Sequence, residues 1–380
     1  MKAILDRKAD ALPAPDPNKI VFHSFSGRVD CNPKYIAREW HRRHPETDLV
    51  WVLDSFSFAR LRRKMPEGTR AVCLGSMSAF REIATAGVVV ENARRMLNLG
   101  MPKKRVGQVW INTWHGSLGI KRLDSMRADT ERLRTAAARD IDALLSNSSF
   151  EDDVFKSWIF SDTKIVRLGH PRNDVFFGSG AGRKGLAQDV KSSLGVPCGT
   201  RLALYAPTFR DGTYFSGAAD FDFDGWSNAL AARFGGDWRV VVRMHPRDAK
   251  GLADGAFSLP ENVINASEYP DIQELMVAAD AAITDYSSWI FDYLLSGKPG
   301  FLLATDIRHF DQKRGFYYPL SATPFSVAEN ESELLKNISS FDETAYGVKV
   351  EAFLKEKGCV EDGHAAERVC DLIEKHLKRK

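Results

Sequence analysis

Short apolar runs, each followed by a helical pattern, recur in two series along the chain and constrain its fold more than any other feature. The first series comprises residues 19–22, 49–53, 71–74, 86–90, 109–114, 143–146 and 164–168. The second series comprises residues 202–206, 239–243, 263–264, 281–283 and 300–303. Continuous apolar strands that alternate with helices are typical of parallel sheets covered on both faces. We therefore expect an α/β protein with two Rossmann-like parallel-sheet domains that face a cleft.

The two series predict a domain boundary near residue 190. Glycine- and proline-containing segments at 178–183 and 196–199 are typical of linker and loop. We assign residues 1–190 to an N-terminal domain and residues 191–380 to a C-terminal domain. Helices from about Glu331 onward should close the second domain, and the last of them is a candidate to cross back to the first.

Composition excludes several classes of protein. A net charge of +3 over 380 residues argues against a nucleic-acid-binding protein. The first residues lack the apolar core of a signal peptide, no apolar run reaches the length of a membrane span, and the five cysteines show no paired short spacing. We therefore expect a cytoplasmic protein with reduced thiols and neither a disulfide framework nor a zinc site. The basic cluster at 375–380 indicates either a solvated helix end or a weak attraction to an anionic membrane face.

The stretch from 284 to 299 places polar residues between a strand and a helix. The apolar strand 281–283 precedes it, and an apolar stripe at helical spacing runs until Gly297. Ser287 and Ser288 therefore stand at a helix N-terminus, where unpaired N–H groups and a partial positive charge suit a phosphate. The alternative is that one of the two hydroxyls only caps the helix. From this stretch alone we give the two interpretations equal weight.

Polar clusters follow four of the predicted strands. They are His115-Gly116-Ser117, Pro207-Thr208-Phe209-Arg210, Met244-His245-Pro246 and Asp285-Tyr286-Ser287-Ser288. Ligands of open parallel sheets bind beyond the carboxyl ends of the strands. These clusters are therefore the candidate binding residues of the protein.

His115 is the candidate general base. A histidine at a strand end beside a glycine has room for a substrate hydroxyl, and a neutral imidazole can accept its proton. The alternative is a His115 ring that is hydrogen-bonded within its loop. Lys121 follows shortly after and is either a phosphate contact or part of a solvated basic face.

Arg172 is a candidate phosphate ligand. It lies in a turn fixed by Pro171, so its guanidinium is a rigid fork that suits phosphate oxygens, unless it pairs with Asp174 or another carboxylate. Thr208 and Arg210 resemble a second pair of donors.

Arg243 and His245 alternate along a strand end, so both point the same way and suit one anion. The alternative is a surface arginine and a histidine packed against Pro246. Asp292 lies one helical turn after Ser288, where it suits the orientation of a hydroxyl or the support of the helix start.

Several cofactor and catalytic motifs are absent from the sequence. There is no Walker loop, no dinucleotide-binding fingerprint, no serine nucleophile elbow and no cluster of metal ligands. We therefore expect neither a cofactor nor a metal.

Taken in order, the motifs resemble the CDP-glycerol glycerophosphotransferase family, the teichoic acid primases and polymerases. The matching text comprises His23 to Tyr35 with Asn32-Pro33-Lys34-Tyr35, Trp114-His115-Gly116-Ser117 with Lys121, Gly169-His170-Pro171-Arg172-Asn173-Asp174, Ala206-Pro207-Thr208-Phe209-Arg210-Asp211, Arg243-Met244-His245-Pro246, Thr284-Asp285-Tyr286-Ser287-Ser288 with Phe291-Asp292-Tyr293, and Arg314-Gly315-Phe316-Tyr317. Each piece is weak alone, but the ordered set covers nearly the whole chain. The chain departs from the family after His115, where many members read His-Gly-Thr-Pro-Leu-Lys and this chain reads His-Gly-Ser-Leu-Gly-Ile-Lys, one residue longer and without the proline.

The resemblance implies a glycosyltransferase-B-like fold and the transfer of glycerol phosphate, or a related polyol phosphate, from a CDP-activated donor with release of CMP. The implied partners are CDP-glycerol or CDP-ribitol as donor and a lipid-linked or capsular or teichoic glycan as acceptor. The N-terminal domain would serve the acceptor and the C-terminal domain the donor nucleotide. The implied location is the cytoplasm, with peripheral contact at the inner face of the cell membrane as an option.

Carried over residue by residue, the resemblance makes His115 the base that deprotonates the acceptor hydroxyl and His245 a second catalytic histidine that faces the donor. Lys121 would lie on the acceptor side. The implied donor-binding residues are Gly116, Ser117, Arg172, Pro207, Thr208, Arg210, Arg243, Asp285, Ser287, Ser288 and Asp292. Two other functions stay open. One is a nucleotide-sugar glycosyltransferase of the same fold, and the other is a non-catalytic glycan-binding relative, against which the pair of histidines argues.

Overall fold

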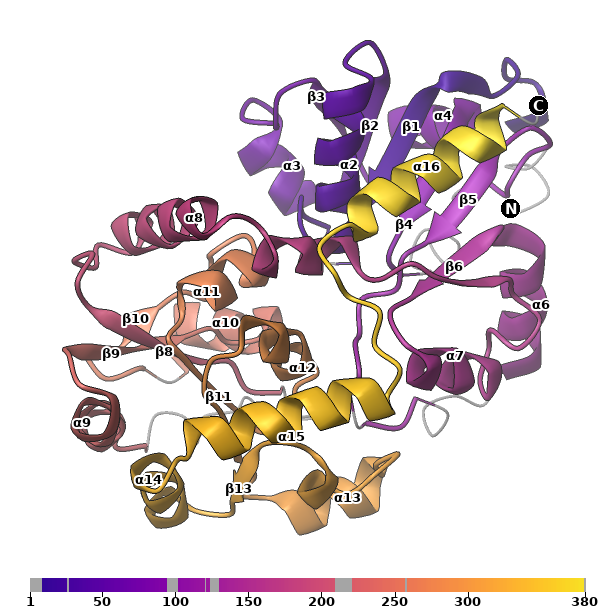
Figure 1. Ribbon diagram of the computed structural model, residues 1–380. Helices are drawn as coiled ribbons and strands as arrows, with labels where there is room; N and C mark the ends of the chain where they lie inside the picture. Colours follow the sequence, from indigo (N-terminus) through magenta and orange to yellow (C-terminus); the bar gives the residue numbers. More distant parts are fainter. Residues whose placement is uncertain are drawn as a thin grey trace. The chain divides into compact units, whose positions relative to one another are not determined.

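The computed structural model describes residues 9–25, 27–93, 102–119, 121–123, 130–208, 221–256 and 258–378. The chain divides into two compact units. Unit 1 comprises Met1–His115, Arg127–Phe177 and Cys359–Lys380, and unit 2 comprises Gly116–Met126 and Gly178–Gly358. Each unit is built on one parallel sheet with helices around it (Figure 1). The α/β class expected from the two series of apolar runs is confirmed.

Unit 1 contains a sheet of seven parallel strands in the order β3-β2-β1-β4-β5-β6-β7. The strands are β1 (Asp16–His23), β2 (Asp48–Leu53), β3 (Thr69–Cys73), β4 (Ala86–Glu91), β5 (Val109–Asn112), β6 (Ala143–Ser146) and β7 (Ile165–Arg167). Ile20 and Phe22 of β1 pack in one core cluster and Val21 packs in another, because helices cover both faces of the sheet. This burial on two sides explains why the strands are continuous apolar runs in the sequence.

Helices from both ends of the chain cover one face of this sheet. Ile36 and Trp40 of α2 pack with Val369 and Ile373 of α16, so the core begun near the start of the chain is completed near residue 370 (Figure 1). On the other face, Ile83 of α4 packs against β1 and β2. The helices of unit 1 are α2 (Cys31–Arg43), α3 (Ser55–Leu61), α4 (Met77–Thr85), α6 (Thr130–Asp140), α7 (Ser149–Lys156) and α16 (Ala365–Leu377), with a 3-10 helix at Pro171–Phe176.

Unit 2 contains a sheet of six parallel strands in the order β10-β9-β8-β11-β12-β13. The strands are β8 (Arg201–Tyr205), β9 (Trp238–Val242), β10 (Ile264–Asn265), β11 (Ala281–Thr284), β12 (Gly300–Leu303) and β13 (Ser326–Ala328). Its helices are α8 (Gly180–Ser193), α9 (Phe223–Phe234), α10 (Pro246–Ala253), α11 (Ile272–Ala278), α12 (Trp289–Tyr293), α13 (Ile307–Arg314), α14 (Glu331–Ser339) and α15 (Glu343–Glu356), with 3-10 turns at Leu294–Ser296 and Leu320–Ala322. Strands β9, β8 and β11 are neighbours, so their carboxyl ends share one edge of the sheet.

Every predicted strand overlaps a strand of the structure, but residues 180–183 of the predicted linker at 178–183 are helical. The helix α8 begins at Gly180, and the Ser179 hydroxyl caps it by accepting the Gly182 N–H at 3.1 Å. The glycine-rich composition misled the prediction because a serine N-cap supports a helix start even among weak helix formers.

The sequence predicts a single domain boundary near residue 190, but the two units of the structure divide elsewhere. That position lies within α8, whereas the units divide between Phe177 and Gly178. Residues 359–380, which include α16, belong to unit 1. The roles of the two domains as acceptor side and donor side stay a prediction. A membrane-spanning helix, which needs about 20 apolar residues, is absent from the described part of the chain.

Candidate active site

His115 lies just beyond the carboxyl end of β5, where the backbone takes an unusual turn. Trp114 has a φ of 54°, in the left-handed region that residues other than glycine rarely adopt. Its N–H donates to Asn112 Oδ1 at 2.9 Å. Its indole packs edge-on against the rings of Phe155 and Phe160, at centroid distances of 5.5 and 5.8 Å. A strained residue fixed in this way is typical of the surroundings of a functional group.

The ring of His115 is held in one tautomer. Its Nδ1 lies 2.7 Å from the carbonyl oxygen of Asn92. A carbonyl oxygen can only accept, so Nδ1 carries the hydrogen and Nε2 is the basic nitrogen of the ring. The rings of Phe25 and Trp114 lie against the imidazole, at centroid distances of 4.7 and 4.6 Å.

The surroundings of His115 keep its imidazole neutral. The pKa of the ring is lowered from 6.5 to about 4. Burial is the main cause and the positive charge of Arg172 acts in the same direction, whereas the hydrogen bond to Asn92 opposes it. At neutral pH the ring is therefore uncharged and able to accept a proton.

Asn32, in the first turn of α2, links the segments that carry His115 and Arg172. Its Nδ2 donates to the carbonyl oxygens of Thr113 and Trp114 at 2.9 and 3.2 Å, and its Oδ1 accepts the Arg172 N–H at 3.1 Å. Because carbonyl oxygens only accept and an N–H only donates, these partners fix the orientation of the amide. The Asn32 side chain is fully buried, so breaking these bonds would leave polar groups without water.

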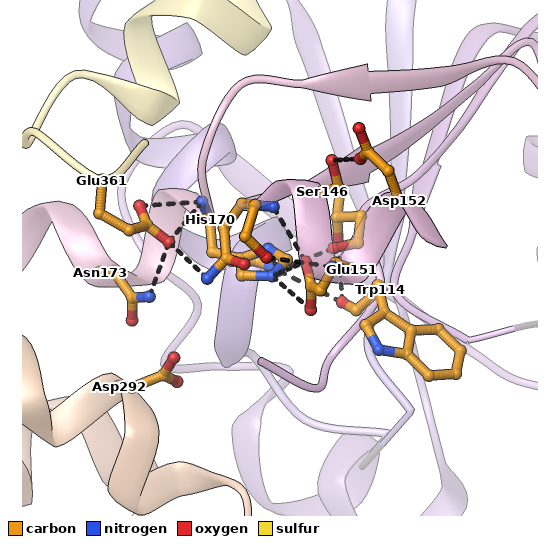
Figure 2. A network of polar contacts seen from close by, with 12 residues as sticks. Trp114, Ser146, Glu151, Asp152, His170, Asn173, Asp292 and Glu361 are labelled. Carbon is orange, nitrogen blue, oxygen red and sulfur yellow. Dashed lines mark hydrogen bonds and ion pairs between the residues drawn. The ribbon is translucent and has the colours of Figure 1, made fainter. Parts of the chain in front are cut away.

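His170 is the centre of a buried polar network (Figure 2). Its Nε2 donates to the carboxylate of Glu151 on α7, with distances of 3.0 and 3.2 Å to the two oxygens. Its Nδ1 accepts from the Asn32 amide at 3.4 Å. His170 and Glu151 are 0% and 2% exposed. These partners fix the ring, and with it the turn that leads to Arg172.

Glu361, between α15 and α16, holds the same turn from a distant part of the chain (Figure 2). Its carboxylate accepts the backbone N–H of His170 at 3.1 Å. It also accepts hydrogen bonds from the side-chain amides of Asn147 and Asn173, at 3.1 and 3.0 Å. The segment that returns to unit 1 therefore supports the turn that carries Arg172.

Arg172 lies inside unit 1. Its side chain is 2% exposed, and its charge acts on the pKa of His115. Asp174, which we considered as its partner, accepts the N–H groups of Ala365 and Ala366 at the start of α16, at 2.9 and 2.7 Å. Burial raises the pKa of Asp174 to about 6, against the effect of these two N–H groups. The contact of Arg172 with phosphate stays a prediction.

The predicted donor residues of unit 2 follow three neighbouring strands. Pro207 and Thr208 come after β8, Arg243 and His245 after β9, and the turn 285–288 after β11. Because β9, β8 and β11 are adjacent and parallel, the sheet brings all of them to one edge.

Asp285 joins two of these strand ends. Its Oδ1 accepts the Thr208 N–H at 2.9 Å and the Tyr286 N–H at 2.5 Å. The Trp289 indole N–H donates to the carbonyl oxygen of Ala206 at 2.8 Å. Through these hydrogen bonds the buried carboxylate of Asp285, which is 2% exposed, holds the loops after β8 and β11 together.

Arg243 and His245 flank the buried Met244, whose N–H donates to Ser267 Oγ at 3.1 Å. Both residues lie beyond the end of β9 at Val242, so their common direction toward one anion stays a prediction. Nη1 of Arg243 donates to the carbonyl oxygen of Tyr269 at 2.5 Å. This bond fixes the direction of the guanidinium.

Ser287 and Ser288 precede α12, which is five residues long. Ser288 is the N-cap residue, and its side chain makes no capping hydrogen bond. The capping interpretation therefore does not apply to Ser288. A helix this short sums few peptide dipoles, so a phosphate here would be bound by the hydroxyls and N–H groups rather than by a helix dipole. The predicted stop is confirmed, since Gly297 has a φ of 69°.

Gly116, Ser117 and Lys121 belong to unit 2, whereas His115 belongs to unit 1. Lys121 pairs with Phe316 in an isolated antiparallel bridge. The three residues thus lie in the unit that carries the predicted donor residues.

Asp292, in α12, is 2% exposed, and Gln273 Nε2 of α11 donates to its Oδ2 at 3.4 Å. Arg210 lies outside the described residues. Within the described ranges, no group of three or more His, Cys, Asp or Glu side chains is arranged to hold a metal ion.

Sequence reasoning missed Asn92, Glu151 and Glu361, and it gave no role to Asn32. Asn92 acts on His115 through its carbonyl oxygen, which no side-chain pattern can signal. Glu361 lies 191 residues from His170 along the chain, so only co-variation among relatives would have linked them.

Two parallel-sheet α/β units with polar residues at their carboxyl edges define a glycosyltransferase-B-like fold. The family model for CDP-Glycerol:Poly(glycerophosphate) glycerophosphotransferase matches residues 8–375. The chain therefore belongs to this family, and the resemblance drawn from the ordered motifs is confirmed.

Curated relatives take part in teichoic acid synthesis, according to their names. The chain is 30% identical to the teichoic acid poly(glycerol phosphate) polymerase of Staphylococcus epidermidis, over 95% of this chain and 51% of that protein. It is 27% identical to the teichoic acid glycerol-phosphate transferase of Staphylococcus aureus, over 94% and 93%. It is 31% identical to the teichoic acid ribitol-phosphate primase of Bacillus spizizenii, over 85% and 84%. The chain thus spans about half the length of the first of these relatives.

A solved structure of the wall teichoic acid polymerase TagF is 28% identical, with a TM-score of 0.81 over 100% of this chain and 93% of that chain. HepE from Anabaena, solved with UDP and glucose, is 13% identical, with a TM-score of 0.50 over 94% and 99%. The second likeness concerns the fold alone. Together they confirm the predicted fold class.

Proposed function

We propose that the protein moves glycerol phosphate, or a related polyol phosphate, from a CDP-activated donor to a hydroxyl of a glycan acceptor, with release of CMP. Family membership and the names of the relatives support this activity. The observation that carries the proposal is His115, a neutral imidazole in a single tautomer at a strand end. Its Nε2 suits the acceptance of a hydroxyl proton.

In the proposed reaction, the acceptor hydroxyl attacks the phosphorus that carries the polyol. A P–O bond forms to the acceptor oxygen. The bond from that phosphorus to the bridging oxygen breaks, and CMP leaves with the electron pair. The hydroxyl proton passes to Nε2 of His115 and then to solvent. Phosphoryl transfer of this kind depends on charge neutralisation and alignment more than on covalent help.

The pKa of about 4 makes His115 a weak base in the free protein. Donor phosphates close to the ring would stabilise the imidazolium and raise this pKa toward the working pH. Donor binding would therefore make His115 a stronger base for the attack of the acceptor hydroxyl.

We assign the donor to unit 2 and the acceptor side to unit 1. The common edge of β9, β8 and β11 supports a single phosphate site there. His245 is the second catalytic histidine. Lys121 is assigned to the acceptor although it belongs to unit 2. Arg172 is a further phosphate ligand, and its positive charge also lowers the pKa of His115. The donor-binding groups are Gly116, Ser117, Pro207, Thr208, Arg210, Arg243, Asp285, Ser287, Ser288 and Asp292.

For the acceptor, the names of the relatives support a teichoic acid glycan. The ribitol-phosphate primase among them supports CDP-ribitol as the alternative donor. We propose that the glycan is lipid-linked or capsular, and that the protein works in the cytoplasm with peripheral contact at the membrane. The exposed Lys375 and Lys378 at the end of α16 support attraction to anionic lipid.

The test is CMP release from CDP-glycerol and from CDP-ribitol with a panel of teichoic and lipid-linked glycan acceptors. We expect acceptor-dependent CMP release by the wild type. His115→Gln should lower the rate by about 10²–10⁴-fold without unfolding the protein. His309→Gln is the matched control, because His309 lies exposed on α13, and it should keep the wild-type rate.

Three outcomes would contradict parts of this proposal. Absence of CMP release with both donors across the panel would refute the activity. A wild-type rate in His115→Gln would refute the role of His115 as general base but not the transferase activity. Turnover of UDP- or GDP-sugars in place of CDP-polyols would establish a nucleotide-sugar glycosyltransferase instead.

A further inference from the structure

Residues 117–119 and 121–123 follow His115 in the chain, belong to unit 2 and pack against other parts of that unit. We call these residues the docked segment. Leu118 is 1% exposed, and its carbonyl oxygen accepts the hydroxyl of Tyr318. Gly119 follows directly, and its N–H donates to the carbonyl oxygen of Ser117 at 2.5 Å, which makes a tight turn. The docked segment is thus anchored immediately before Gly119.

A second group of contacts anchors the docked segment after Gly119. All of them are made with residues 315–317, which lie just beyond α13. They are the bridge of Lys121 with Phe316, the bond from Arg122 N–H to the Gly315 carbonyl oxygen at 3.1 Å, and the bond from Leu123 N–H to the Tyr317 hydroxyl at 3.1 Å. Gly119 therefore lies between two fixed points.

Gly119 lies against Ser288. A Cβ added to Gly119 would come within 2.8 Å of the Ser288 Cβ and 3.6 Å of the Ser288 Cα. Carbon atoms that are not bonded prefer about 3.5–4.0 Å, so the first distance forces a displacement and the second is an ordinary contact. The Cβ of serine moves only with its backbone, so rotation of the hydroxyl cannot relieve the clash.

We expect the displacement to fall on Ser288, at the end of its helix. The anchors at Leu118 and Arg122 hold the docked segment on both sides of Gly119. Ser288 is half-buried and stands at the start of the five-residue helix α12, where its carbonyl oxygen accepts the Phe291 N–H at 3.1 Å. A side chain at position 119 therefore pushes the start of α12 and the Ser287–Ser288 turn.

We propose that Gly119 is a positioning residue for donor binding. Its missing side chain allows the docked segment to lie against Ser288 and keeps the two serines where they hold the donor phosphates. This inference rests on the proposed function, which assigns the donor to these serines. It also gives a physical reason for the glycine in the longer segment where this chain departs from the common pattern after His115.

The test is a double-mutant cycle read by calorimetric titration with CDP-glycerol and with CDP-ribitol. Gly119→Ala should raise the Kd by about tenfold or more, because a misplacement of this size weakens an aligned site. Ser288→Gly loses a hydroxyl, but it removes the atom that clashes. Gly119→Ala should therefore have no further effect in the Ser288→Gly background. Gly185→Ala is the matched control, because an added Cβ there meets nothing within 4 Å.

The outcomes separate this inference from the proposed function. Wild-type protein that binds neither CDP-glycerol nor CDP-ribitol would overturn both. A wild type that binds, with an unchanged Kd for Gly119→Ala, would overturn only the role of Gly119, even if the unfolding temperature fell. An equal loss of affinity in both backgrounds would overturn the contact with Ser288 as the cause.

Discussion

Protonation of His115 should appear as a loss of stability in mild acid. Burial lowers the pKa of this ring from 6.5 to about 4. A group whose pKa is lower in the folded than in the unfolded protein weakens folding when it becomes charged. Its stabilising contribution is therefore complete above pH 6.5 and is lost as the pH falls toward 4. The loss should reach about 3 kcal/mol, since one pKa unit corresponds to about 1.4 kcal/mol.

The measurement is the difference in free energy of unfolding between wild type and His115→Gln, from urea titrations at several pH values between 4 and 6.5. The difference is needed because Asp174 acts in the opposite direction. Its pKa, raised from 3.8 to about 6, gives stability below pH 3.8 that is lost as the pH rises through 6. Both proteins contain Asp174, so its effect cancels.

Two further measurements of the His115 pKa test this prediction. An NMR titration of the imidazole should give a midpoint near 4, and the acid limb of kcat/KM, which reports the free enzyme, should lie at the same pH. The acid limb of kcat should lie higher, because bound phosphates favour the imidazolium. An NMR midpoint near 6.5, together with a stability difference that does not depend on pH, would show that the ring is solvated and would contradict the lowered pKa.

Two variants test the network around His170. Asn32→Asp places a carboxylate oxygen against two backbone carbonyls, so we expect the free energy of unfolding to fall by roughly 3–5 kcal/mol, with partial recovery in acid. Urea unfolding at two pH values measures this, and wild-type stability would contradict it. Glu361→Gln turns one carboxylate oxygen, an acceptor of hydrogen bonds, into a donor and should lower stability by about 1–3 kcal/mol. Glu351→Gln, at an exposed position of α15, is the control in thermal unfolding, and equal losses in the two variants would count against the network.

The sheets were predictable from the sequence because each central strand is buried on both faces. Val21 and Phe22 serve different core clusters, so neither position tolerates a polar residue, and the apolar run is continuous. The candidate residues at the strand ends were predictable for a related reason. Parallel strands all end at the same edge, so residues that follow neighbouring strands, such as Thr208 after β8 and His245 after β9, lie at one edge of the sheet although they are distant in sequence.

The supporting contacts were not predictable in this way. The tautomer of His115 depends on a backbone carbonyl, and the orientation of Asn32 depends on three groups from distant segments. Nothing in the sequence indicates the left-handed backbone of Trp114, because tryptophan rarely adopts that conformation. Such features follow from the packed structure, whereas single-sequence patterns report only periodicity and local chemistry.

The return of residues 359–378 to unit 1 has a consequence for biosynthesis. While the ribosome is still making unit 2, Val369 and Ile373 are not yet available to cover α2 and the sheet, and the carboxylate of Glu361 cannot yet hold the His170 turn. A nascent or prematurely terminated chain therefore lacks the contacts that complete the unit 1 core and hold the His170 turn. Proteins cut short before residue 359 should therefore unfold more easily and be less active than the full chain.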